Sequence, residues 1–65
     1  MGPERFIIGN SEDAEAEYGS RDEQAVTVIE LYEGEVTCVY GFDTVEAAKA
    51  DLLNGGAVNG QISYL

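Results

Sequence analysis

The chain has 65 residues, of which 13 are acidic, 3 are basic and none is histidine, so its formal net charge is −10. A domain of about 60 residues buries only about 60% of the surface that its unfolded chain exposes, so we expect one domain with a thin core. The lack of histidine and the single cysteine, Cys38, exclude a Cys/His zinc site, a Ser-His-Asp or Cys-His catalytic pair and an intrachain disulfide. The sequence therefore predicts a non-enzymatic protein with no cofactor and no metal site.

Hydrophobic residues make up 45% of the chain and fall in patterned runs, which separates it from disordered acidic tails. Uninterrupted apolar stretches such as residues 6–8 are far shorter than the roughly 18 residues of a membrane-spanning helix. Residues 1–4 lack the basic start of a signal peptide. One thiol without an export signal favours a reducing, cytoplasmic location.

The chain begins with a predicted strand. Residues 5–8 form a short apolar run that Gly9 and the following asparagine close. Alternation places Phe6 and Ile8 on one face of this strand and Ile7 on the other.

The next segment, residues 11–18, has two interpretations. A capping Ser or Asn, acids in the first turn and Gly19 after the last residue favour a two-turn helix. The same residues alternate acids with alanines, which suits a strand or an extended loop, and eight residues are too few for propensity to decide. The polar residues 20–24 predict a connection.

Two β-branched runs, residues 26–32 and 35–40, flank Glu33-Gly34 and predict a tight hairpin. A two-residue loop would pair Tyr32 with Glu35 and Ile29 with Cys38. One face of the hairpin would then form the core, which makes Cys38 a small buried hydrophobic residue, and the other would be an apolar and acidic outer face. The predicted core face carries Ile29, Leu31, Val36, Cys38 and Tyr40, and the predicted outer face carries Val28, Glu30, Tyr32, Glu35, Thr37 and Val39.

An Asp-x-x-Glu capping box at residues 43–46, followed by apolar residues at helical spacing, predicts the main helix. Asn-Gly-Gly at residues 54–56 ends it, and residues 61–65 predict a final edge strand. The predicted order is β-α-β-β-α-β. We therefore expect an α+β domain in which a small, mostly antiparallel sheet of three or four strands is covered by one main helix.

The acidic residues are the only group of side chains in the sequence that could bind a metal ion or act as catalytic groups. Asp13 and Glu17 are spaced as carboxylates that could bind Ca²⁺ or Mg²⁺, but the EF-hand spacing is absent. Paired carboxylates for glycoside hydrolysis would need a substrate cleft that so short a chain does not offer. A solvated acidic surface is the simplest explanation, yet a charge of −10 exceeds the magnitude of about 2 to 8 that solubility requires and destabilises a thin core by self-repulsion. The excess charge therefore favours a basic partner.

Small, strongly acidic, single-domain chains without catalytic residues resemble the phage-encoded inhibitors of bacterial defence, in particular the anti-CRISPR proteins, several of which are DNA mimics. The resemblance is one of size, charge and missing catalytic groups. It implies a monomer, or weak homo-oligomer, in the host cytoplasm that occupies the basic DNA-binding surface of a Cascade-like CRISPR effector complex and blocks target DNA. It implies no direct binding of nucleic acid or membrane. The residues predicted to contact the partner are Glu12, Asp13, Glu15, Glu17, Asp22, Glu23, Glu30, Tyr32, Glu33 and Glu35.

A second hypothesis belongs to another class of protein. The outer face of the sheet, with Val28, Tyr32 and Val39, or the final edge strand could pair with another chain. The protein would then be a protein-interaction or assembly module.

Overall fold

The computed structural model describes residues 2–65 of the protein. The elements within these residues follow the predicted order and confirm the α+β fold class. They are β1 (Arg5–Asn10), α1 (Ser11–Tyr18), β2 (Val26–Tyr32), β3 (Glu35–Phe42), α2 (Val45–Asn54), a single 3-10 turn η1 (Asn59–Gln61) and β4 (Ile62–Tyr64).

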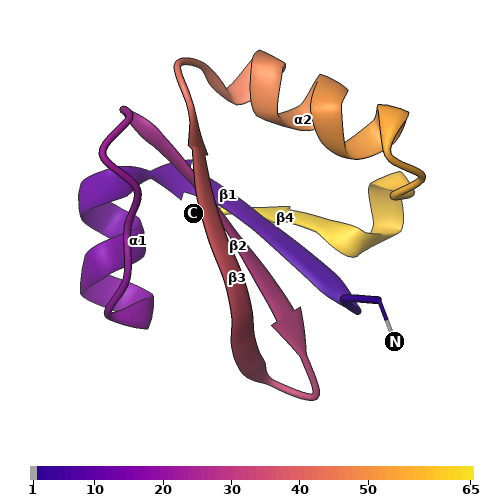
Figure 1. The fold of residues 1–65 in the computed structure, drawn as a ribbon, viewed down its shortest axis with the longest axis horizontal. Helices are drawn as coiled ribbons and strands as arrows, with labels where there is room; N and C mark the ends of the chain where they lie inside the picture. Colours follow the sequence, from indigo (N-terminus) through magenta and orange to yellow (C-terminus); the bar gives the residue numbers. More distant parts are fainter. Residues whose placement is uncertain (1) are drawn as a thin grey trace.

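The strands form one sheet in the order β3-β2-β1-β4 (Figure 1). β2 is antiparallel to both of its neighbours, whereas β4 lies parallel to β1, so the sheet is mixed and mostly antiparallel. The amide of Leu65 donates to the carbonyl of Ile8 at 2.9 Å and extends the β1–β4 pairing beyond β4. The last segment is therefore an edge strand, as the sequence predicts.

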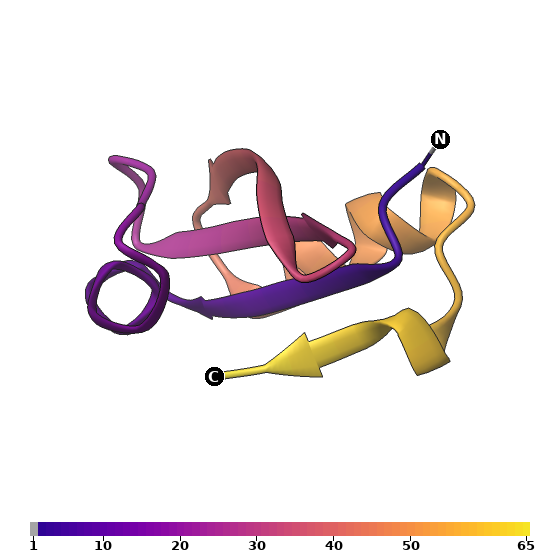
Figure 2. The same ribbon diagram turned by 90° about the horizontal axis from the view of Figure 1, so that it is seen from below.

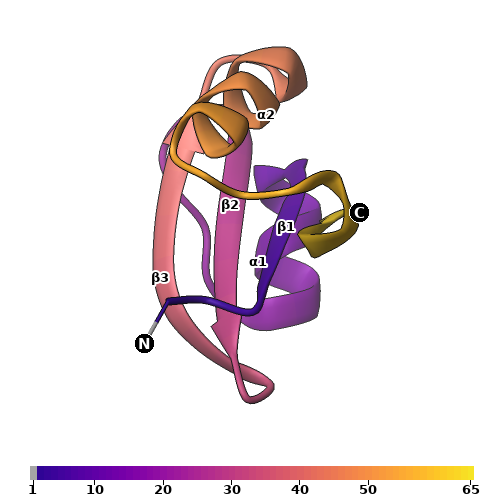
Figure 3. The same cartoon turned by 90° about the vertical axis from the view of Figure 1, so that its right-hand side faces the viewer.

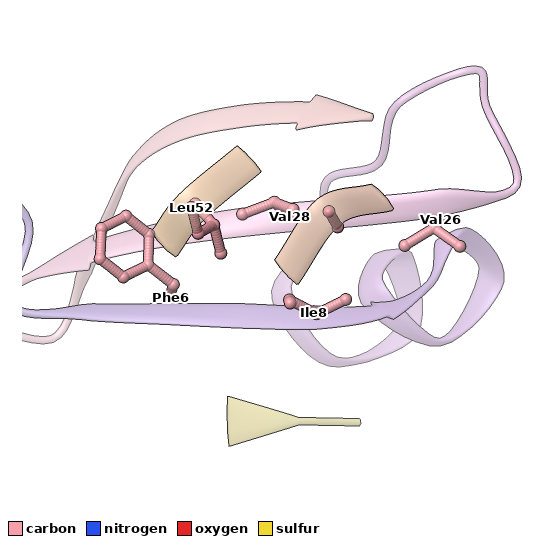
Figure 4. Packing of buried hydrophobic residues seen from close by; sticks show 6 residues of the cluster. Phe6, Ile8, Val26, Val28 and Leu52 are labelled. Carbon is pink, nitrogen blue, oxygen red and sulfur yellow. The ribbon is translucent and has the colours of Figure 1, made fainter. Parts of the chain in front are cut away.

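The two helices pack on opposite faces of this sheet. Because side chains alternate along a strand, one set of apolar side chains from β1 and β2 packs under Leu52 of α2. Phe6 and Val28 belong to this set and are buried (Figure 4). The other face packs Ile7 and Ile29 against Ala14 of α1. Figures 1 and 3 show α1 and α2 on different sides of the strands, and Figure 2 shows α1 end-on beside the end of β1. The longer helix α2 covers one face as predicted, and α1 covers the other.

The hairpin has a β-bulge that the sequence reasoning missed. Tyr32 pairs with Glu35 as predicted, but the register then shifts, so that Ile29 pairs with Val39 and not with Cys38. Thr37 is the additional residue on β3, and its hydroxyl donates to the carbonyl of Glu30 at 3.2 Å.

This shift reverses the predicted faces of β3. Tyr40 lies opposite Val28 and joins the side of the sheet under α2. Val28, predicted to face outward, is 0% exposed, and Cys38, predicted to be buried, is exposed. Of the predicted outer face, Val28 and Glu30 therefore lie on the side that α2 covers, whereas Val39 packs on the α1 side and Glu35 and Thr37 stay exposed, so these residues do not form one free surface for a partner. One inserted residue is sufficient, because side chains alternate with a period of two.

The helix caps settle the conformation of residues 11–18. The side chain of Asn10 accepts a hydrogen bond from the amide of Glu12 at 2.8 Å, and Gly19 adopts a left-handed conformation with φ 75°. Both features are typical helix boundaries, so this segment is a helix and not an extended strand.

The N-cap of α2 is Thr44, one residue later than the predicted Asp43. The Thr44 hydroxyl accepts a hydrogen bond from the amide of Ala47 at 3.1 Å, while Thr44 itself is extended. Both residue types are good caps, so composition alone did not distinguish them. The predicted C-terminal boundary of the helix is confirmed, since Gly55 is its C-cap.

Candidate acidic interface

The exposed side of α1 is the most strongly acidic surface of a helix in this fold. Ser11 and Ala14 are its buried residues and fix which side faces the sheet. The last turn contains no basic residue. Asp13 and Glu17 are four residues apart and therefore lie along one strip of the helix. All four acids of the helix are exposed: Glu12, Asp13, Glu15 and Glu17.

A buried hydrogen-bond chain attaches α1 to the sheet. The Ser11 hydroxyl donates to the carbonyl of Gln24 and lies 2.6 Å from the Thr27 hydroxyl. The Thr27 hydroxyl in turn accepts from the amide of Asp22 at 3.0 Å. Ser11 and Thr27 are 1% and 0% exposed, and without partners their buried hydroxyls would destabilise the folded state. This series of hydrogen bonds supplies those partners. It fixes the N-terminus of α1 and the connection 20–24 on β2, and sequence reasoning did not identify it.

Asp22 has a structural role in that connection. Its carboxylate accepts from the amide of Gln24 at 3.0 Å, and it lies so close to Gly41 that a Cβ at that position would overlap its Oδ2 atom. The side chain of Gln24 donates to the Gly41 carbonyl at 2.9 Å. Asp22 is therefore part of the packing between the connection and β3, whereas the neighbouring Glu23 is exposed.

The hairpin acids form a separate group. Glu33 and Glu35 are exposed beside the β2–β3 turn, and Tyr32 is half-buried. β2 runs from the N-terminal end of α1 to this turn, about 20 Å in six steps of about 3.3 Å, and α1 packs along part of that length, with Ala14 against Ile29 (Figure 1). The amide of Glu33 donates to the carboxylate of Glu4 at 2.9 Å, so Glu4 joins this group although it was not a predicted site residue.

Glu30 belongs to a third location, on the side of the sheet that α2 covers. It pairs directly with Phe6 across β1 and β2, and its carboxylate accepts a hydrogen bond from the Tyr40 hydroxyl. Burial, together with the hydrogen bond and charge of Glu30, raises the pKa of Tyr40 well above its usual value. The structure therefore does not bring Glu30 together with the acids of α1.

The acids do not converge into a metal centre. Within residues 2–65, no group of three or more Asp, Glu, Cys or His side chains is placed to hold a metal ion. None of the helices in this part of the chain combines the length and the apolar character needed to span a membrane.

Comparisons with protein-family models, with curated proteins and with solved structures find no match to this chain. They assign no family to it. Its function must be inferred from the placement and the charge of its own residues.

Proposed function

We propose that the chain is an acidic inhibitor that uses the exposed side of α1 to occupy a basic, nucleic-acid-binding surface of another protein. The single observation that carries this proposal is the set of four exposed carboxylates on α1, which has no basic residue in its last turn. Like charges along one helix destabilise it, and acids near its C-terminal end oppose the helix dipole. A binding partner would offset both costs.

The spacing of these carboxylates suits a nucleic-acid-binding surface. Positions 12 to 17 of a helix span about 7.5 Å at about 1.5 Å per residue, so four acids give roughly one charge per 2.5 Å. Duplex DNA carries one negative charge per about 1.7 Å of its axis when both strands are counted. A Lys/Arg-lined DNA channel would therefore meet a comparable charge density on α1, divided between two strips of the helix, with Asp13 and Glu17 on one and Glu12 and Glu15 on the other.

The resemblance in size and charge to anti-CRISPR proteins makes a Cascade-like CRISPR effector complex the proposed target. Binding there would exclude target DNA by competition for the same basic side chains. Because such binding releases counterions, its affinity should fall steeply as the salt concentration rises.

The test compares two pairs of exposed acids, one on α1 and one at the start of α2. The variant Asp13→Lys/Glu17→Lys changes the net charge from −10 to −6, since each substitution adds two units, and Asp43→Lys/Glu46→Lys makes the same change beside α2. We expect the α1 pair to weaken binding to a crRNA-loaded Cascade-like complex by about a hundredfold, at about 1.4 kcal/mol for each reversed contact. Restored binding of target DNA should accompany the loss.

The α2 pair should change the affinity much less, because it alters the total charge but not the α1 surface. Circular dichroism would establish that both variants are folded. Equal losses for the two pairs would show that only net charge matters, and no binding by the unaltered protein would refute the CRISPR effector as its target.

The placement of β3 favours a second candidate, the interaction module. β3 is an edge of the sheet, and Glu35, Val36, Thr37 and Cys38 at its start are exposed. Pairing of a second chain along this edge would make the protein an assembly module. Sedimentation at low and high salt separates the candidates, since an assembly of chains with like charge should tighten as salt screens their repulsion.

A further inference from the structure

A pocket of about 290 Å³ lies between the start of β1, the hairpin and the C-terminal end of α2. Its apolar part comes from Pro3 and from Phe6 and Leu52, and the last two lie close together in the core (Figure 4). Its polar part comes from the side chains of Glu30, Tyr40 and Asp51. Three distant segments of the chain therefore combine a small apolar surface with two carboxylates and the phenol of one tyrosine.

The electrostatics of the pocket favour a cation. Glu30 and Asp51 each bring a carboxylate, and none of the residues that line the pocket in the described part of the chain is basic. Gly55, the C-cap of α2, also lines it, and the C-terminal end of a helix carries a partial negative charge. The face of a tyrosine ring attracts cations as well.

The Tyr40 hydroxyl gives this arrangement a fixed geometry. It donates its proton to the Glu30 carboxylate, so it holds that carboxylate beside the ring and leaves the remaining oxygen lone pairs free to accept from a ligand. Tyr40 and Phe42 are in edge contact with their ring centres 5.9 Å apart, which further restrains the Tyr40 ring.

We propose that this pocket binds an alkyl cation, a short aliphatic chain that ends in an ammonium or guanidinium group. The aliphatic chain would lie on Phe6 and Leu52 while the cation contacts Glu30 and Asp51. The volume is at the lower limit of small-molecule pockets, which suits one long side chain or one small amine and not a larger ligand. The same chemistry has two sources, a lysine or arginine side chain of a protein and a free alkylamine.

This site is independent of the proposed function of α1. The pocket lies on the face of the sheet that α2 covers, whereas α1 lies on the opposite face. Loss of α1 binding in the charge-reversal variant would therefore leave the pocket intact.

The test is an NMR titration of the full chain with n-butylammonium and n-butylguanidinium at constant ionic strength. We expect saturable shifts confined to the amides around the pocket, with affinity for n-butylammonium at least about fivefold higher than for its neutral analogue n-butanol, as expected for one partly screened charge contact. Capped arginine and lysine amides, added in parallel, identify the source: tighter binding than the free amines indicates a protein side chain, and weaker binding indicates a free amine.

Two double variants of equal net charge test whether the carboxylates of the pocket bind the cation. Glu30→Gln/Asp51→Asn should weaken n-butylammonium about five- to tenfold, while Asp43→Asn/Glu46→Gln, with the same net charge, should not. The comparison of charged and neutral probes on the unaltered protein remains valid even where a variant unfolds. Equal affinity for n-butanol and n-butylammonium, or shifts spread over all acidic segments without saturation, would overturn the proposal.

Discussion

The two helices cover opposite faces of one small sheet, but they are attached to it by different chemistry. α2 contributes the buried side chains of Ala48 and Leu52, and its acid in the first turn lies where the helix dipole favours negative charge. α1 contributes only Ala14 and the buried Ser11, and it carries acids along its whole length. Glu12 and Asp13 lie in the first turn of α1, where its dipole also favours them, whereas Glu15 and Glu17 lie beyond it. The contrast indicates that α2 contributes more buried apolar surface to the fold, whereas repulsion among the acids of α1 destabilises that helix.

The largest difference between the two helices should be the loss of unfolding free energy when a buried side chain of each is shortened. Leu52→Ala removes the main apolar contact of α2 and should lower the free energy of unfolding by about 2–5 kcal/mol, measured by urea denaturation. Ala14→Gly on α1 should lower it by about 2 kcal/mol, the sum of the usual cost of glycine inside a helix and the loss of one buried methyl group. If the two substitutions cost the same, the helices would contribute equally to stability, contrary to our interpretation.

Alkaline pH should act on the α2 face through Tyr40. The pKa of Tyr40 is raised in the folded state by burial and by Glu30, so folding favours the neutral phenol. The stabilisation is complete below about pH 10, the ordinary pKa of tyrosine, and is lost as the pH rises toward the higher folded value. The free energy of unfolding should therefore decrease above pH 10 in the unaltered protein and decrease less in Tyr40→Phe. Identical pH profiles for the two proteins would contradict the assigned hydrogen bond to Glu30.

The salt dependence of the free energy of unfolding should depend more on the acids of α1 than on those at the start of α2. Screening of self-repulsion should raise the free energy of unfolding by about 1 kcal/mol between about 0.05 M and about 1 M NaCl. Neutralising Asp13 and Glu17 should reduce this increase more than neutralising Asp43 and Glu46, because α1 carries four acids and no base, whereas Lys49 lies three residues after Glu46 on α2. Equal reductions would mean that the position of the acids has no influence on stability.

The smallest expected effect is that of a single charge reversal on stability, and it should have opposite signs on the two helices. Glu17→Lys replaces an acid near the C-terminal end of α1 and converts a repulsive pair with Asp13 into an attractive one, so it should stabilise by about 0.3–1 kcal/mol. Glu46→Lys places a cation in the first turn of α2 and should destabilise by a similar amount. Thermal denaturation at low salt measures both, and a common sign would refute the difference between the helices.

The order of elements could be predicted because its signals are local. Asn10, Gly19 and Gly55 act within one turn of the chain, and each lies at an observed helix boundary. The β-bulge at Thr37 could not be predicted, because a run of β-branched residues has the same composition with or without an extra residue. The consecutive apolar residues Val28 and Ile29 did carry a signal that was missed, since such runs are typical of a sheet buried on both faces.

The candidate site was predictable only in part. Acids are exposed on almost any fold, so the acidic side of α1 followed from its sequence once it was a helix. The separate location of Glu30 depends on contacts with Tyr40 and with Asp51 of α2, which join segments that are distant in the chain. The role of Asp22 depends likewise on its approach to Gly41. Tertiary contacts of this kind leave no pattern in a single sequence.

The most direct measurement of the central claim is an NMR footprint of the labelled chain on addition of a crRNA-loaded Cascade-like complex at moderate salt. Our account predicts that the amides of α1, Ser11–Tyr18, broaden selectively, that those of α2, Val45–Asn54, broaden far less, and that target DNA reverses the effect. Broadening centred on α2 or on the β3 edge, or no broadening at all, would contradict the assignment of α1 as the docking surface.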